Sequence, residues 1–230
     1  PVPNIQPPLQ RLLARLADPA AARRFVPLSS AAITAHSDTL RGLVTELFVT
    51  DFSDPIGHLA ALLRVVKASR VPLVARVNGA CMAGGMGLMS MCDLAVAAPH
   101  VVFGLPEVKI GVFPAQVLSV LQHLIPRRKL VEMCITGEPL TSAEALEIGL
   151  VNYVDADLDG RLNWLLGRLL DKSPAAIRRG LYTMKKIESM AFEESMSFTE
   201  SQIALFTLTE DAREGKLAFQ EKRAPQWTGR

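Results

Sequence analysis

The sequence predicts an α/β fold in which short apolar strands alternate with helices, followed by a helical C-terminal region. Residues 71–77, 94–98 and 101–104 are apolar runs of strand length, and segments with helical spacing separate them. From about residue 162 the apolar residues recur only at helical spacing. These observations indicate repeated strand and helix units that end in a helical part.

The N-terminal part fits this pattern least well. Residues 1–8 are rich in proline, residues 9–16 have helical spacing, and only residues 24–28 resemble a strand. The regular pattern begins with an amphipathic helix predicted over residues 58–66 and a buried strand over residues 71–77.

A glycine-rich corner joins this strand to a helix predicted over residues 88–92. Its four glycines are Gly79, Gly84, Gly85 and Gly87. The first N–H groups of a helix lack intrahelical partners and lie at the positive end of its dipole. Because glycine has no side chain, a ligand can approach this backbone closely. The corner either serves packing alone or holds an anion or a carbonyl oxygen that becomes negative during reaction.

The elements after the corner continue the alternation. The two apolar runs over residues 94–98 and 101–104 predict strands, and Pro114 opens a helix that should stop near Pro126. Residues 131–136 suit a helix or a strand.

A capping box, Thr141-Ser142-Ala143-Glu144, starts a helix that should run to Ile148 and end at Gly149. Residues 151–154 predict one more strand. Three helices should follow, the second beginning at Pro174. The tail carries Trp227, which predicts packing on another surface, for example another subunit.

Composition excludes several protein classes. The chain has 230 residues, 49% of them hydrophobic, and a net charge of +2. This charge is too small to favour nucleic acid as the main partner. The three cysteines form no CxxC pair or Cys/His cluster, so we expect reduced thiols, no metal and a cytoplasmic location. No apolar run has the roughly 20 residues of a membrane helix, so we expect no membrane partner.

The glycine corner is also the first of several motifs that follow one another in a fixed order. They are Val77-Asn78-Gly79 with Ala83-Gly84-Gly85, Met91 to Ala97, Phe103 to Val108 with Gly111 and Pro114, Thr136-Gly137 with Ala143 to Val151, and Phe219 to Arg223. In this order and spacing they resemble the crotonase superfamily, the enoyl-CoA hydratases and isomerases.

The resemblance implies a fold, a substrate and an assembly. Residues 1–160 would form a spiral of ββα units that binds an acyl-CoA thioester, with the first 40 residues atypical. Residues 161–230 would form a helical region that assembles homotrimers or hexamers. No separate cofactor is implied, because coenzyme A is part of the substrate.

The resemblance also assigns site residues. The N–H of Gly84 would be one of two backbone donors to the thioester oxygen. The other would come from Ser37, in a segment that also brings Asp38 and Leu40 to the substrate. Further contacts are implied for Gly85, Pro106 and Pro114, and Lys222 would bind coenzyme A phosphates across a subunit boundary. Arg178, Arg179, Lys185 and Lys186 instead predict a solvated basic helix face.

The number of glutamates at the site distinguishes hydration from isomerisation in this family. Hydratases of this family use two glutamates, and at those positions this chain has Gly87 and Glu107. Without the resemblance, Glu107 would be a surface carboxylate beside Lys109. With it, Glu107 would move a proton between two carbons of a β,γ-enoyl thioester, a Δ3,Δ2 isomerisation.

Two other interpretations stay open. The first is hydration of a branched or glutaconyl-type substrate by a single glutamate, with Gln116 helping to place water. The second is an acyl-CoA binder without catalysis.

Overall fold

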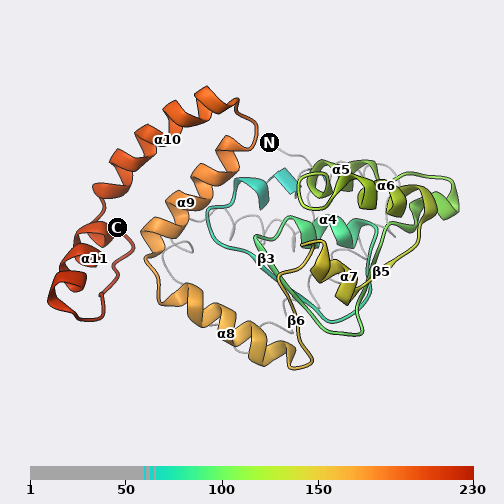
Figure 1. Cartoon of the computed structure of the whole chain (residues 1–230), viewed down its shortest axis with the longest axis horizontal. Helices are drawn as coiled ribbons and strands as arrows, with labels where there is room; N and C mark the ends of the chain where they lie inside the picture. The colour runs from blue at the N-terminus through green and yellow to red at the C-terminus, as the bar shows by residue number, and fades with distance from the viewer. Residues whose placement is uncertain (1–59, 61–62, 65) are drawn as a thin grey trace, which may run out of the picture.

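The computed structural model describes residues 60, 63–64 and 66–230 of the chain (Figure 1). The elements expected over residues 9–16 and 24–28 lie outside the described residues. Residues 60, 63–64 and 66–68 are helical, in agreement with the helix predicted there.

Short strands and helices alternate in the first part of the described chain. The strands are β1 (Val74–Val77), β2 (Cys81–Met82), β3 (Leu94–Ala97), β4 (Val102–Gly104), β5 (Leu140–Thr141) and β6 (Tyr153–Val154). The helices between them are α4 (Gly84–Ser90), the 3-10 helix η2 (Pro106–Ile110), α5 (Ala115–Leu121), α6 (Arg127–Thr136) and α7 (Ser142–Glu147).

The strands form two small sheets. In the first, the order is β1-β3-β6 and all pairs are parallel. In the second, β2 lies parallel to β4, and β5 lies antiparallel to β4. The first four strands therefore go to alternate sheets, and a helix follows each pair of strands. This arrangement confirms the predicted ββα units.

The core lies between these sheets and the helices that cover them. Phe103, Met86, Leu105 and Leu121 are completely buried, and they come from β4, α4, the segment after β4, and α5. Because packed cores have few voids, these side chains fix α4 and α5 against the second sheet.

The sequence placed some element boundaries wrongly. The strand predicted over residues 94–98 is confirmed as β3, but the helix expected over residues 88–92 begins four residues earlier, at Gly84. A two-residue strand such as β2 gives no readable periodicity, so it was not predicted. The ambiguous residues 131–136 are helical, and α5 ends at Leu121, before Pro126.

The predicted capping box is confirmed at the start of α7. The Thr141 backbone N–H donates to Glu144 Oε2 at 2.8 Å, and the Glu144 N–H donates to Thr141 Oγ1 at 3.3 Å. Each bond satisfies an end group that a helix leaves open, so the capping box fixes the point where α7 begins.

Four helices make up the C-terminal part. The first of them packs against β3, and the other three extend from the sheets as an arm in Figure 1. The four helices are α8 (Leu158–Leu170), α9 (Pro174–Ile187), α10 (Phe192–Thr207) and α11 (Glu210–Glu221). Pro174 is the first residue of α9, as predicted. None of the helices in the described part of the chain combines the length and the hydropathy that a membrane crossing requires.

The tail after α11 folds back onto this arm, and Asp211 holds it there. Asp211 is 2% exposed, and its carboxylate accepts hydrogen bonds from the N–H groups of Thr228 (2.8 Å) and Gly229 (3.0 Å). The Ser173 hydroxyl and the Ala175 N–H also donate to it, at 2.6 and 3.3 Å. One buried carboxylate therefore joins the tail to the start of α9.

Trp227 packs within its own chain. Its Nε1 donates to the Asp171 carbonyl at 3.0 Å, and its ring lies so close to Gly215 that a Cβ there would be 3.2 Å from it. Packing on another subunit is therefore not needed to account for this side chain.

Candidate functional site

The backbone at the start of α4 is held in an unusual conformation. Ala83, between β2 and α4, has a φ of 51° and a ψ of −122°. Such a conformation costs a non-glycine residue about 1–3 kcal/mol and persists only where neighbours enforce it. Here the Ala83 N–H donates to the Gly104 carbonyl at 2.9 Å, and the Ala83 carbonyl accepts from the Met86 N–H at 2.9 Å.

This conformation fixes the N–H group of Gly84, the first residue of α4. Gly84 is buried, and its N–H makes no hydrogen bond to any part of the chain that the structure describes. Gly85 is partly exposed, with open space where a Cβ would stand. An unsatisfied N–H at a helix start is suited to an oxygen that gains negative charge.

Glu107 lies at the same edge of the second sheet. In the parallel pair of β2 and β4, Met82 pairs with Gly104, so Gly84 and Glu107 both follow the carboxyl ends of neighbouring strands. Pro106 begins η2, and Gly111 ends it with a φ of 79°. Topology thus brings together two residues that are 23 positions apart, the difference between 84 and 107.

The carboxyl group of Glu107 is partly withdrawn from water. Its Oε2 is buried and has no hydrogen-bond partner within the described residues. Burial raises the pKa of Glu107 above its ordinary value, and a hydrogen bond from its own backbone N–H opposes part of this effect. Lys109 forms an ion pair with Glu138 at 3.0 Å. Glu107 is therefore not the surface carboxylate beside Lys109 that the residues alone would suggest.

Cys134 of α6 belongs to the surroundings of Glu107, and no motif in the sequence predicts this. Cys134 is 2% exposed. Its thiol pKa is raised first by burial and then by the charge of Glu107. The two residues are near enough for this effect because α6 packs against η2, a tertiary contact that no local motif predicts.

Gly87 lies in the contact between α4 and α5. A Cβ at this position would be 3.2 Å from Val117 Cγ2. The space that a side chain would enter is therefore already occupied by α5. This position therefore provides no second carboxylate.

The other predicted substrate contacts do not all lie near Gly84 and Glu107. Pro114 is buried at the start of α5, next to α4, and Pro106 lies beside Glu107. Ser37, Asp38 and Leu40 lie outside the described residues. Lys222 directly follows α11, which lies on the arm, away from α4 (Figure 1).

The basic residues near the C-terminus form more hydrogen bonds and ion pairs within the chain than predicted. Arg223 forms two hydrogen bonds to Glu214, at 2.6 and 3.0 Å. Lys185 pairs with Asp93 at 3.0 Å and is mostly buried, and Arg178 donates to the Gly229 carbonyl. The expectation of a fully solvated basic face on α9 is therefore wrong for these two residues.

The described residues contain no group of three or more His, Cys, Asp or Glu side chains that could hold a metal ion. Neither Gly84 nor Glu107 lines the cavities of about 590 and 300 Å³ that other described residues form.

Comparison with known proteins shows the family of the chain. A family model described as enoyl-CoA hydratase/isomerase matches residues 44–230. The chain belongs to the enoyl-CoA hydratase/isomerase family. Members of this family act on acyl-CoA thioesters, so the Gly84 N–H and Glu107 lie in an acyl-CoA-processing protein.

Relatives of known sequence cover most of the chain. A mitochondrial enoyl-CoA hydratase domain-containing protein 3 from Xenopus laevis is 27% identical over 99% of this chain and 78% of its own length. A carnitinyl-CoA dehydratase from Escherichia coli O157:H7 is 35% identical over 76% of this chain and 69% of its own.

Solved structures of the family share the fold. A putative enoyl-CoA hydratase/isomerase from Mycobacterium abscessus is 36% identical, with a TM-score of 0.70 over 77% of this chain and 73% of that one. An enoyl-CoA hydratase from Mycobacterium smegmatis is 27% identical, with a TM-score of 0.74 over 78% and 73%. These matches confirm the crotonase-like fold.

Proposed function

We propose that this family member is an enoyl-CoA isomerase with a single proton-transferring carboxylate. The observation that supports the proposal most is the pairing of an unsatisfied Gly84 N–H with a half-buried Glu107 at one sheet edge. At position 87, where hydratases of the family have their second glutamate, this chain has a glycine, and Val117 fills the space that a side chain would enter.

The reaction needs no net gain or loss of protons. The Glu107 carboxylate takes a proton from the carbon next to the thioester of a β,γ-enoyl substrate. The electron pair moves onto the thioester oxygen, and the Gly84 N–H stabilises the resulting dienolate. The protonated Glu107 then gives its proton to the γ-carbon, and the double bond moves into conjugation with the thioester.

Product identification tests this reaction. With a β,γ-enoyl-CoA ester, we expect mass and NMR analysis to show an α,β-enoyl-CoA of unchanged mass. A 3-hydroxyacyl-CoA product, 18 mass units heavier by the addition of water, would instead support hydration. Hydratase and dehydratase names among the relatives give that second candidate its support. No turnover of any enoyl-CoA ester would favour a protein that only binds acyl-CoA.

The pH dependence of kcat/KM should reflect the raised pKa of the buried Glu107. Because Glu107 acts first as a base, kcat/KM should fall as pH falls through its raised pKa, starting at a higher pH than for an exposed glutamate. A pH–rate profile measures this. An activity that stays constant down to the ordinary pKa of glutamate would contradict it.

The raised pKa of Glu107 also makes the stability of the fold depend on pH. Since folding raises the pKa of Glu107, folding favours its protonated form. Its contribution to stability is therefore greatest at low pH and is lost as pH rises through the folded-state pKa. Urea unfolding across this range should show the dependence in the native chain and not in Glu107→Gln.

Filling position 87 should reveal its contact with Val117. We expect Gly87→Glu to lower the free energy of unfolding by about 1–3 kcal/mol, because the new side chain meets an occupied space. Val117→Ala should relieve part of this cost, so the double variant should be more stable than the sum of the single effects by about 0.5–3 kcal/mol. Strictly additive values in this double-mutant cycle would show that the two positions do not compete for space.

We also propose self-association through the C-terminal arm. Exposed apolar side chains gather on its helices, namely Met184 (64% exposed), Phe192 (72%), Ile203 (63%), Leu208 (65%) and Phe219 (85%). Exposed apolar surface of this kind marks interaction sites. Sedimentation analysis should show a trimer or a hexamer, and a monomer at micromolar concentration would contradict the proposal.

A further inference from the structure

The arm formed by α9, α10 and α11 is held together by its own contacts. These helices pack on one another, whereas α8 packs against β3. The rings of Tyr182 on α9 and Phe198 on α10 lie with their centroids 6.1 Å apart. Asp211 of α11 accepts hydrogen bonds from the Ala175 N–H at the start of α9 and from the Gly229 N–H of the tail. The arm is therefore a body with internal links that do not involve the sheets.

The apolar core of the chain stops before this arm. Among the described residues, the buried apolar cluster extends as far as Leu165 of α8 and contains no residue of α9, α10 or α11. Ala175 is the one buried residue of α9, a helix that the structure describes in full. A helix that packs firmly on a core buries a stripe of apolar side chains along its length. The arm is therefore not fixed to the sheets by apolar packing of this kind.

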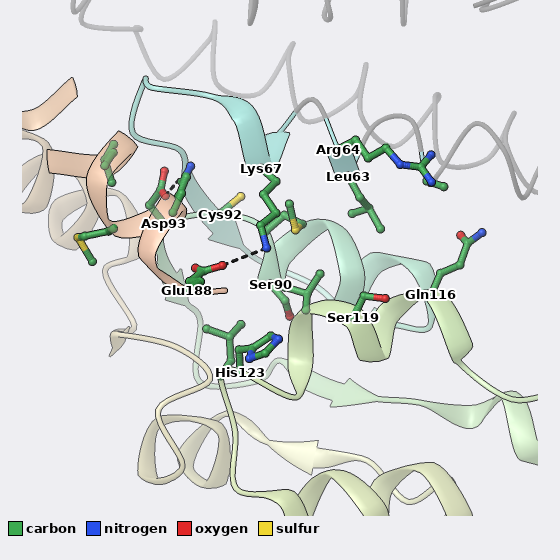
Figure 2. A pocket seen from close by; sticks show the side chains of 17 residues that line it. Leu63, Arg64, Lys67, Ser90, Cys92, Asp93, Gln116, Ser119, His123 and Glu188 are labelled. Carbon is green, nitrogen blue, oxygen red and sulfur yellow. Dashed lines mark ion pairs between the residues drawn. The ribbon is translucent and has the colours of Figure 1, made fainter. Parts of the chain in front are cut away.

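A cavity of about 590 Å³ separates α9 from the helices beside it (Figure 2). Leu181 and Met184 of α9 line it, as do Leu63 from the helical residues before β1 and Val120 of α5. Ser90 of α4 also lines it, is 5% exposed, and has an Oγ without a hydrogen-bond partner among the described residues. Apolar side chains from both bodies thus line one cavity instead of closing it.

A mostly buried ion pair bridges this junction. Lys185 of α9 pairs with Asp93 at 3.0 Å and donates to the Ser69 carbonyl at 3.1 Å. The side chains of Lys185 and Asp93 are only 17% and 14% exposed. Asp93 directly precedes β3, and its Oδ2 accepts from the Leu73 N–H before β1 at 2.8 Å. The Lys185–Asp93 pair therefore joins the arm to two strands of the first sheet.

Two further contacts cross the junction nearer to solvent. Glu188 pairs with Lys67 at 3.0 Å, and both side chains are about half exposed; Figure 2 shows both ion pairs as dashed lines. The Arg70 guanidinium lies 4.7 Å from the centroid of the Tyr182 ring. Exposed ion pairs contribute little and are screened by salt. The position of α9 therefore depends mainly on the Lys185–Asp93 pair.

The connection between α8 and α9 is short. It consists of residues 171–173. Trp227 Nε1 donates to the Asp171 carbonyl at the connection itself, so this bond does not hold the far end of α9. Hinges of moving bodies are a few residues at the ends of elements, and this connection has that position.

We propose that the arm turns as one body about residues 171–173, and that the Lys185–Asp93 pair is the latch that holds it in the position seen in the structure. Loss of one partner of a mostly buried ion pair leaves a charge that gains by reaching water. Releasing the latch therefore favours the turned arm. The exposed apolar side chains of the arm turn with it, so the latch controls the surface presented to a second copy. The hinge is independent of the proposed isomerisation, because neither Gly84 nor Glu107 lines the junction.

Pulsed electron paramagnetic resonance measures this motion as a distance. Spin labels on p-acetylphenylalanine at the exposed positions 128 of α6 and 200 of α10 avoid the native cysteines. Dilution with unlabelled chain restricts the signal to one copy. In the native chain we expect one main distance with a minor second population. Lys185→Met should raise the second population about tenfold relative to the main one, because Asp93 loses its partner.

Two variants serve as controls. Lys185→Met/Asp93→Asn leaves no unpaired charge, so it should return most of the population to the main distance. Asp159→Asn breaks the Arg76–Asp159 pair, which at 2.7 Å joins α8, and not the arm, to the first sheet. It should leave both distances unchanged.

Salt provides a second measurement, in the native chain, which does not depend on any variant folding. The Debye length falls from about 10 Å at 0.1 M to about 3 Å at 1 M, so the Lys67–Glu188 pair weakens. The second population should then increase. A single distance that neither Lys185→Met nor salt changes would overturn the hinge, and so would an equal response in Asp159→Asn.

Discussion

Glu107→Gln should reduce kcat for isomerisation by about 10²–10⁴-fold, because it removes the group that both takes and returns the proton. Glutamine has nearly the same shape but cannot exchange a proton at neutral pH. Binding of a saturated acyl-CoA should change little, since the Gly84 N–H and the rest of the site remain. Steady-state kinetics and calorimetry on the same preparation measure the two effects.

Stability provides the control for this variant. Glu107 Oε2 is buried without a partner within the described residues, so a neutral side chain there should not destabilise the fold. Glu107→Gln should therefore unfold at the same urea concentration as the native chain or a higher one. A variant that keeps more than about a tenth of the native kcat would show that another group transfers the proton.

Asp211→Ala should have the second large effect, on stability. The buried Asp211 carboxylate accepts hydrogen bonds from Ser173, Ala175, Thr228 and Gly229. Its removal leaves several donors without a partner and frees the tail from α9. We expect the free energy of unfolding to fall by about 3–5 kcal/mol, because each buried donor left without a partner costs about 1–3 kcal/mol.

The pH dependence of this effect has a definite sign. Burial alone would raise the pKa of Asp211, but its hydrogen bonds outweigh burial and lower the pKa below the ordinary value. The stabilising contribution is therefore present above the unfolded-state pKa and is lost as pH falls through the folded-state pKa.

Urea unfolding of the native chain and Asp211→Ala from neutral to acid pH measures both points. The two curves should converge at low pH. Asp159→Asn, which removes an exposed partner of Arg76, is the control and should cost no more than about 1 kcal/mol. A loss for Asp211→Ala as small as that of the control would show that Asp211 does not anchor the tail.

The sequence predicted the repeating part of the fold because its signals are local. The capping box at Thr141, the proline at the start of α9 and the apolar run of β3 each lie within a few residues. β2 and β5 are only two residues long, and such strands exist because a neighbouring strand pairs with them. Local periodicity cannot reveal elements of that kind.

The candidate site also contains residues that local signals predict and residues that depend on tertiary packing. Gly84 could be predicted because a glycine corner before a helix has a local physical meaning. The proposed role of Glu107 comes from the resemblance, and the burial of its Oε2 is a property of the folded chain that no local motif predicts. The effect of Glu107 on Cys134 and the position of Val117 beside Gly87 could not be predicted, since both depend on tertiary packing.

Exchange of the α-proton tests the central claim most directly, because it requires enolate formation and no particular product. A saturated acyl-CoA incubated with the chain in deuterated buffer should gain deuterium at the carbon next to the thioester. We expect this gain to disappear in Glu107→Gln. No exchange in the native chain, or undiminished exchange in Glu107→Gln, would contradict a mechanism in which Glu107 moves the proton beside the Gly84 N–H.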